Sequence, residues 1–253
     1  MIRAPQSIGR STRVLAVLGA ILAGASDLPA RETCPVEVKL LLSAQAADNA
    51  IGSLGLAKKT ASRVYFFDTE TLDLFRQRVI VRVRQGADND LTIKVRQPER
   101  QEQGHPERLH GRFPCEIDQT RDGGHVSYSV GNSVKSGKVP ETGKDVRKLL
   151  SSAQARLLRE AGASIDWERV KRVAAIDSTK WTTSAQSPNG KLALELWNWP
   201  KGAILELSAR DRAESAAAAY SGLEQLAQAK GLALSVIQDT KTGTVLQSHP
   251  AEP

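Results

Sequence analysis

A strict alternation of apolar and polar side chains between Val79 and Gln97 constrains the fold of this chain more than any other feature of its sequence. The alternation forms two runs, separated by the turn-forming stretch GADND at 86–90. The apolar positions are Val79, Val81, Val83, Leu91, Ile93 and Val95, and the polar positions between them include Arg82, Arg84, Thr92, Lys94 and Arg96. Because the side chains of a strand point to opposite faces with a period of two, this pattern predicts a β-hairpin with one apolar face and one cationic face.

Two interpretations of the cationic face are open at this point. Like charges that lie directly opposite each other on a sheet destabilise it by up to ~1 kcal/mol per pair. The face is therefore either a solvated surface, where water screens the repulsion, or a surface that binds an anion. The hairpin by itself favours the solvated surface.

The N-terminus has the pattern of a signal peptide over residues 1–25. Arg3, Arg10 and Arg13 precede an apolar core, VLAVLGAILAGA, whose final Ala-Gly-Ala suits a cleavage site. The core is short for a membrane span, so an uncleaved anchor is the less favoured alternative, and no later stretch of the sequence is long and apolar enough to span a bilayer. We therefore predict export, to a periplasmic or extracellular location. Cleavage would remove three of the 35 basic residues and leave 32 against 28 acidic ones, which lowers the net charge from +7 to +4 and gives no argument for a nucleic-acid partner.

The predicted export bears on the two cysteines of the chain. An oxidising compartment favours a disulfide between Cys34 and Cys115, and a pair of buried free thiols is the alternative. The four histidines are at positions 105, 110, 125 and 249, in predicted loops or the tail, without the spacing of a zinc site. Zinc catalysis is therefore disfavoured.

The remaining periodicities predict an α+β protein in which antiparallel strands dominate. Besides the hairpin, we expect strands at 34–42, 64–68, 112–118, 170–181, 191–199 and 203–210, and a weak strand at 125–130. Helices are expected at 43–57, 145–159 and 213–231. Short connections within each group of strands favour antiparallel pairing. The predicted domain covers residues 34–237, and residues 240–253 are predicted to form a disordered tail.

Charges of both signs lie on one face of most of these predicted strands. Outside the hairpin they include Glu37, Lys39, Glu116, Asp118, Arg172, Glu195 and Glu206. An open sheet with one wet face would explain them. The alternative is a closed barrel with helices outside and charges inside, in which the cations bind phosphate oxygens and the carboxylates bind a divalent metal. An interior charge is costly unless it is paired or solvated, so this second interpretation requires a wet, occupied bore.

The order of these motifs resembles that of the CYTH domain, the triphosphate tunnel metalloenzymes. That family has, in order, ExExK, a segment like YFDTxxxDL, RxR, a lysine strand, ExE, an arginine strand and a C-terminal ExE. The matching segments here are PVEVK (35–39), YFFDTETLDL (65–74), RVR (82–84), LTIK (91–94), EID (116–118), KR (171–172) and ELS (206–208). The resemblance spans roughly residues 34–235, and its most specific part runs from Tyr65 to Lys94.

The resemblance implies a closed antiparallel barrel, or tunnel, of about eight strands with helices packed outside. It implies phosphohydrolase activity on tripolyphosphate, short polyphosphate or nucleoside triphosphates, although some members are adenylate cyclases. Lys39, Arg82, Arg84, Lys94 and Arg172 would bind phosphate, with Glu37 and Lys39 acting in catalysis. Mg²⁺ or Mn²⁺ would be the cofactor, held by Glu37, Glu116, Asp118 and Glu206.

Two departures from the family pattern concern positions that are associated with metal binding. Pro35 stands at the first Glu of ExExK, and Ser208 stands at the second Glu of the C-terminal ExE. The remaining carboxylates suffice for one metal ion. Three hypotheses follow: a metal-dependent phosphohydrolase, a catalytically weak or inactive tunnel that binds a polyanion in the cell envelope, and an envelope domain that has kept the fold without the ligand. The expected partner is a polyanionic small molecule and not a nucleic acid, and the sequence does not reveal the oligomeric state.

Overall fold

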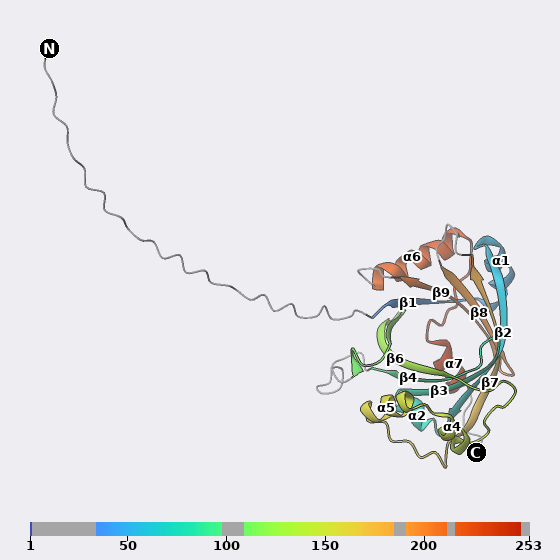
Figure 1. Ribbon diagram of the computed structural model, residues 1–253. Coiled ribbons are helices and arrows are strands. Elements are labelled where there is room, and N and C mark those ends of the chain that lie inside the picture. The colour runs from blue at the N-terminus through green and yellow to red at the C-terminus, as the bar shows by residue number, and fades with distance from the viewer. Residues whose placement is uncertain (2–33, 98–108, 185–190, 212–215, 249–253) are drawn as a thin grey trace. The chain divides into compact units, whose positions relative to one another are not determined.

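The computed structural model describes residues 34–97, 109–184, 191–211 and 216–248, together with Met1 (Figure 1). The predicted signal peptide therefore lies outside the described residues, apart from Met1. Within the described part of the chain, no helix is long and apolar enough to cross a membrane.

The described strands close into a barrel in the order β1-β5-β6-β4-β3-β2-β7-β8-β9, with β9 pairing back to β1. The strands are β1 (Val36–Leu42), β2 (Leu56–Asp68), β3 (Val79–Gly86), β4 (Asp90–Arg96), β5 (Cys115–Thr120), β6 (Gly123–Ser133), β7 (Lys171–Thr183), β8 (Leu192–Trp199) and β9 (Gly202–Asp211). The closed α+β barrel is thus confirmed.

Two details of the predicted barrel were wrong. The described residues form nine strands, where about eight were expected, and β1 pairs with β5 in parallel, from Val36↔Ile117 to Val38↔Gln119. The second difference follows from the first. Strand direction can alternate all the way around a ring only if the number of strands is even, so a nine-stranded ring must contain a parallel pair. The other paired neighbours in the described barrel are antiparallel.

The hairpin of β3 and β4 has the two faces that its alternation predicts. The odd-numbered residues from Val79 to Val95 on these strands are buried, and the polar residues between them are half-buried. The apolar face points outward and packs under α4 (Gly143–Leu149) and α5 (Ser152–Glu160). The predicted helix 145–159 is divided between these two helices, because Ser151 caps α5 in a capping box with Gln154. The cationic face consequently points into the barrel.

A second apolar layer covers the opposite outer side of the barrel. Alternate residues of β1, β8 and β9, such as Val38, Leu194 and Leu207, pack against the helical residues Ala50 and Leu223. The helices of this layer are α1 (Ala47–Ser53), which follows the 3-10 turn η1 (Ala44–Ala46), and α6 (Ala216–Ala229). The short helix α2 (Asp73–Arg76) lies between β2 and β3. Because the two apolar layers lie outside the ring, much of its interior is free for polar side chains.

The C-terminal segment enters the barrel, contrary to the prediction of a disordered tail from residue 240. Helix α7 (Lys241–Gln247) begins at Thr240, whose side chain accepts a hydrogen bond from the Gly243 N–H. Val245 and Leu246 are buried in an apolar cluster with Phe66, Ile80 and Trp197, which lie on inward-facing positions of three strands. Figure 1 shows α7 within the ring of strands. Residues 249–253 lie outside the described part of the chain.

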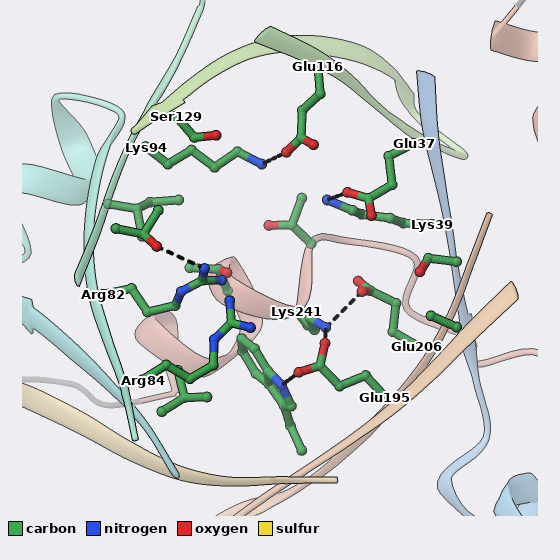
Figure 2. Close-up of a pocket in the computed structure, with 18 of the residues that line it drawn as sticks. Glu37, Lys39, Arg82, Arg84, Lys94, Glu116, Ser129, Glu195, Glu206 and Lys241 are labelled. Carbon is green, nitrogen blue, oxygen red and sulfur yellow. Dashed lines mark hydrogen bonds and ion pairs between the residues drawn. The ribbon is translucent and has the colours of Figure 1, made fainter. Parts of the chain in front are cut away.

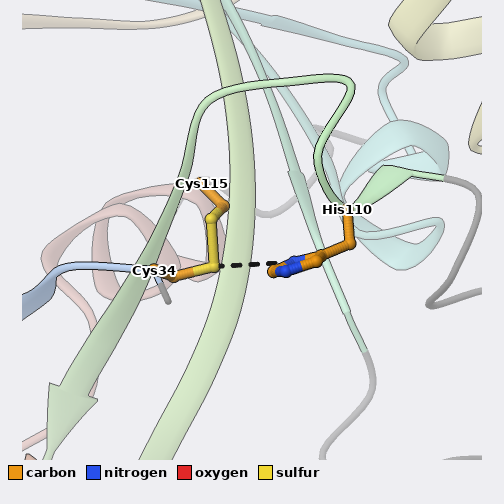
Figure 3. Close-up of a disulfide and its surroundings, with 3 residues drawn as sticks. All are labelled: Cys34, His110 and Cys115. Carbon is orange, nitrogen blue, oxygen red and sulfur yellow. Dashed lines mark hydrogen bonds between the residues drawn. A yellow bond between two sulfur atoms is a disulfide. The ribbon is translucent and has the colours of Figure 1, made fainter. Parts of the chain in front are cut away.

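A disulfide joins the ends of the two parallel strands, as the sequence analysis predicted. Cys34 precedes β1 and Cys115 begins β5; their sulfur atoms are bonded and their Cα atoms are 5.2 Å apart (Figure 3). The register between β1 and β5 contains three residue pairs, so this is a short seam in the ring. The bond therefore fastens the seam at which the barrel closes.

Replacing both cysteines by serine, in Cys34→Ser/Cys115→Ser, is expected to lower the free energy of unfolding by about 2–5 kcal/mol, because the bond closes a loop of 81 residues in the unfolded chain. Chemical denaturation of both proteins measures the difference. A reductant should lower the denaturation midpoint of the wild type toward that of the double variant, and it should not change the midpoint of the double variant. Equal stability of the variant and the wild type without reductant would show that the seam does not depend on the bond.

Candidate functional site

The interior of the barrel is a polar cavity of about 260 Å³ whose lining carries more positive than negative charge. The cationic side chains that line it in the described part of the chain are Lys39, Arg82, Arg84, Lys94, Arg96, Lys180, Arg210 and Lys241. The lining carboxylates are Glu37, Glu116, Glu195 and Glu206. In Figure 2 the two arginines of β3 lie on one wall, and Glu37 and Glu206 lie on the opposite wall. An elongated anion between these walls would meet cations on one side and carboxylates on the other.

The arginine wall comes directly from the hairpin. Arg84 lies 3.1 Å from Asp88 and 3.4 Å from Asp90, whereas Arg82 donates a 3.2 Å hydrogen bond to Thr92 and is 3.9 Å from Asp90. Burial and the neighbouring Arg84 lower the pKa of Arg82. The buried Nε atoms of Arg82 and Arg96 have no hydrogen-bond partner among the described residues. A buried donor without a partner is costly, so these two atoms mark a place for acceptor oxygens.

Three of the four predicted metal ligands lie together on the opposite wall. Glu37, Glu116 and Asp118 each offer a carboxylate oxygen, and these oxygens lie within 4.8 Å of one another. Two lysines also reach this carboxylate cluster. Lys39 pairs with Glu37 at 3.1 Å and with Asp118, and Lys94 pairs with Glu116 at 2.8 Å and with Asp118. The predicted phosphate ligands Lys39 and Lys94 thus lie beside the predicted metal ligands.

Asp118 holds the carboxylate cluster together. Its side chain is 1% exposed and also accepts a hydrogen bond from Ser127 at 2.8 Å. Burial alone would raise the pKa of Asp118, but the ammonium groups of Lys39 and Lys94 outweigh burial and hold the pKa well below its usual range. Burial would lower the pKa of Lys39, but Asp118 and Glu37 raise it above the ordinary value of a lysine. Burial and the nearby Lys39 lower the pKa of Lys94.

A second cluster of charges, which the sequence analysis missed as a unit, includes a residue of the predicted tail. Glu195 and Glu206 lie directly opposite each other in the register of β8 and β9, and Lys241 of α7 pairs with both, at 2.8 Å from Glu206. The Lys241 ammonium also lies 4.6 Å from the centre of the Trp197 ring. Burial would raise the pKa of Glu195, but Lys241 and hydrogen bonds from Ser178 and Trp197 lower it far more. Glu206, the fourth predicted metal ligand, is therefore held by a lysine from the C-terminal helix.

Arg172 does not lie with the other predicted phosphate ligands. The register between β2 and β7 shifts from Phe66↔Ala174 to Phe67↔Arg172, so Val173 is an extra residue in the ladder. The bulge turns Arg172 outward, where its guanidinium carbon lies 5.6 Å from the centre of the Tyr65 ring. Lys180, farther along β7, lines the cavity instead. A register shift of this kind leaves no mark in the local sequence.

The two departures from the family pattern have different surroundings. Pro35 is exposed at the start of β1, and its carbonyl accepts a hydrogen bond from the Ile117 N–H at 2.8 Å. Ser208 lines the cavity and lies opposite Lys39 in the register of β1 and β9. Pro35 is thus not part of the described lining of the cavity, whereas Ser208 is.

Comparison with solved structures identifies the architecture. One similar structure is a protein from Hippeastrum described as a putative adenylyl cyclase with a dominant triphosphatase activity; it is 17% identical, covers 84% of this chain and 94% of its own, and has a TM-score of 0.56. Another is a putative adenylate cyclase from Bacillus halodurans, with 15% identity, coverage of 83% and 96%, and a TM-score of 0.55. The chain has the fold of the CYTH triphosphate tunnel proteins. No protein-family model and no curated protein matches the sequence of this chain.

Replacing Lys241 by methionine is expected to destabilise the protein by about 3–5 kcal/mol at neutral pH, because two facing carboxylates would lose their shared cation. The loss should shrink on acidification. With Lys241 present, the lowered pKa of Glu195 gives a stabilisation that is complete above the unfolded pKa of about 4.3 and is lost only as the pH falls below that value toward the folded pKa. Between neutral pH and pH ~4 the stability of the wild type should therefore change little through Glu195, and the change should come from the variant. In Lys241→Met, one glutamate gains a raised pKa, so protonation stabilises the variant. Melting temperatures of both proteins between neutral pH and pH ~4 measure the gap.

Two further variants control this measurement. Lys230→Met removes a lysine just beyond α6 and should leave the melting temperature within the small range of surface substitutions. Adding Glu195→Gln to Lys241→Met should restore part of the stability, because it removes one of the two facing charges. If the difference in melting temperature between the wild type and Lys241→Met did not change with pH, the coupling between Lys241 and the glutamates would be contradicted.

Proposed function

We propose that this protein is a metal-dependent phosphohydrolase that acts on tripolyphosphate or a related triphosphate chain within the tunnel. The observation that carries the proposal is the lining, where eight cationic side chains face four carboxylates and two buried arginine Nε atoms have no partner among the described residues. A chain of phosphates matches this excess of cations and supplies the acceptor oxygens. The description of the Hippeastrum protein as a triphosphatase supports the same reaction class.

The residues present fit one divalent metal ion. Glu37, Glu116 and Asp118 supply oxygen donors from one compact cluster, which is the chemistry that Mg²⁺ and Mn²⁺ prefer. A bound ion would neutralise charge on the phosphate oxygens and polarise them. The pairing of Glu206 with Lys241 and the serine at position 208 favour a single ion at this cluster over a pair.

The side chains of the tunnel would then divide the work by position. Arg82 and Arg84 would hold the phosphate chain against one wall, and Lys94 would contact it between the walls, since its ammonium already lies in the carboxylate cluster. Glu37 would orient the attacking water, and Lys39 would stabilise the charge that develops in the transition state. This is catalysis by positioning and charge neutralisation, as in other phosphoryl transfers.

Location favours an inorganic substrate. The predicted signal peptide and the Cys34–Cys115 disulfide support an exported protein, and nucleoside triphosphates are scarce outside the cytoplasm. We therefore place inorganic tripolyphosphate ahead of ATP as the substrate.

The second candidate is a tunnel that binds a polyanion without hydrolysing it. It is favoured by Pro35 and Ser208, and by the two lysines that already pair with every member of the carboxylate cluster. An ion must compete with Lys39 and Lys94 for these carboxylates, so weak metal binding would leave a binding protein.

The phosphohydrolase is tested by measuring the phosphate that is released by a protein whose chain begins at Ser26. Tripolyphosphate and ATP are each offered with Mg²⁺, Mn²⁺ or EDTA. We expect metal-dependent release that falls by about 100-fold or more in Arg82→Ala/Lys94→Ala, because donors aimed at developing charge are typically worth this much. Arg172→Ala is the matched control, since it removes an arginine outside the tunnel, and it should keep wild-type activity. No release, with tripolyphosphate still raising the melting temperature of the wild type alone, would select the binding protein.

Binding of Mn²⁺ tests the metal site without relying on activity. We expect paramagnetic resonance of free Mn²⁺ to show one bound ion per chain, with affinity reduced about 10-fold or more in Glu116→Gln, which removes one of three carboxylate ligands. Glu224→Gln, on α6 outside the tunnel, is the control and should bind like the wild type. Unchanged binding in Glu116→Gln would exclude the carboxylate cluster as the metal site.

A further inference from the structure

A basic groove continues the tunnel beyond one of its mouths. Its volume is about 500 Å³, and it shares Glu37, Lys180, Ala193, Ser208 and Arg210 with the lining of the tunnel cavity. The residues that the groove adds are Lys58, Thr182, Thr183, Ser184, Lys191 and Leu192. The two spaces are therefore connected along a common wall.

The groove arises because β2 and β7 extend past the hairpin. The pairing of β2 with β3 begins at Ser62, whereas its pairing with β7 continues back to Leu56. Lys58 and Lys180 lie on the face of this extension that continues the inner wall, because their spacing from Val64 and Ser178 is even. Lys59, one residue away, lies on the other face with its ammonium 5.7 Å from the Trp181 ring.

The charges of the groove are nearly all of one sign. Four cations, Lys58, Lys180, Lys191 and Arg210, face one carboxylate, that of Glu37, in the described lining. Lys58, Lys180 and Lys191 are exposed and have no ion-pair partner among the described residues. Arg210 sits at the junction, 3.6 Å from Glu37 and 3.5 Å from Glu116 of the carboxylate cluster. A ligand that leaves the cluster toward solvent thus meets further cations.

The composition of the groove distinguishes between two kinds of anion. A nucleoside triphosphate would place a base and a sugar at this mouth, and bases are usually held by stacking on aromatic rings. The described lining of the groove contains no aromatic side chain; besides charged residues it offers hydroxyl groups and the aliphatic side chains of Leu192 and Ala193. Lysines and hydroxyl groups suit more phosphate.

We propose that the groove binds the distal part of a linear inorganic polyphosphate that is longer than the tunnel cavity can hold. This inference rests on the proposed function of the tunnel, and it extends the inorganic ligands of the tunnel to chains of more than three phosphates. Tripolyphosphate occupies only the inner cavity, whereas a longer phosphate chain passes Arg210 and reaches Lys58 and Lys191 in the groove.

The proposal is tested by calorimetric titration of the wild type and of Lys58→Ala/Lys191→Ala. The ligands are tripolyphosphate, ATP and a long polyphosphate of defined length. The double variant should bind the long chain about three- to tenfold more weakly, as expected for two exposed ion pairs. The dependence of log K on log salt should also become shallower for that ligand, by about one to two for two lysines. Binding of tripolyphosphate and ATP should not change, because neither lysine lines the inner cavity.

Lys59→Ala/Lys230→Ala is the matched control, because it removes the same charge from the outer surface and should bind all three ligands like the wild type. Equal losses for tripolyphosphate and the long chain, or equal losses in the control, would mean that the lysines act through net charge, and the groove proposal would fail. If the wild type bound tripolyphosphate but the double variant lost nothing with the long chain, only the groove proposal would fail. If the wild type bound none of the ligands, the proposed function of the tunnel would fail as well.

Discussion

Every charge inside a closed barrel needs a partner, and the carboxylate of Asp118 serves two lysines at once. Lys39 comes from β1 and Lys94 from β4, and both reach Asp118 on β5. These contacts connect strands on both sides of the parallel seam, where backbone pairing is short and the disulfide lies. These ion pairs therefore link the strands across the seam, and their shared carboxylate belongs to the cluster that supplies oxygen donors to the site. A ligand or an ion in the tunnel must exchange with these pairs, so binding should be coupled to rearrangement of the seam.

The apolar core lies outside the barrel, and its packing supplies stability that offsets the cost of a polar interior. Hydrophobic stabilisation comes from two layers between the barrel and its helices, not from filling the bore. Where the bore is apolar, around Phe66, Ile80 and Trp197, helix α7 fills it with Val245 and Leu246. The helix thus divides the barrel into a packed part and a wet part, and Lys241 stands at the boundary between them.

The sequence predicts those parts of the fold that depend on local alternation. The hairpin shows the agreement, because a period of two determines which residues share a face, and burial on β3 and β4 follows it except at Ile80, which is buried in the inner apolar cluster. The family resemblance then places Glu37, Arg82, Arg84, Lys94 and Glu116 in one cavity, as the structure does. What alternation cannot specify is which strands become neighbours. The parallel pairing of β1 with β5 follows from closing a nine-stranded ring, which is a property of the whole chain.

The residues that were misplaced or missed share a physical cause. Arg172 has the parity of an inward residue relative to Ala174, and the bulge at Val173 reverses it because of how β7 pairs with β2. Lys241 lies in a polar segment with a weak apolar pattern, and its helix is stabilised by inserting Val245 and Leu246 among side chains from distant strands. One local signal did exist. Glu195 and Glu206 lie at facing positions of two predicted strands joined by a tight turn, and two buried carboxylates in that arrangement require a cation from elsewhere in the chain. A search for the missing cation among the lysines that follow the last strand would have pointed to the C-terminal segment.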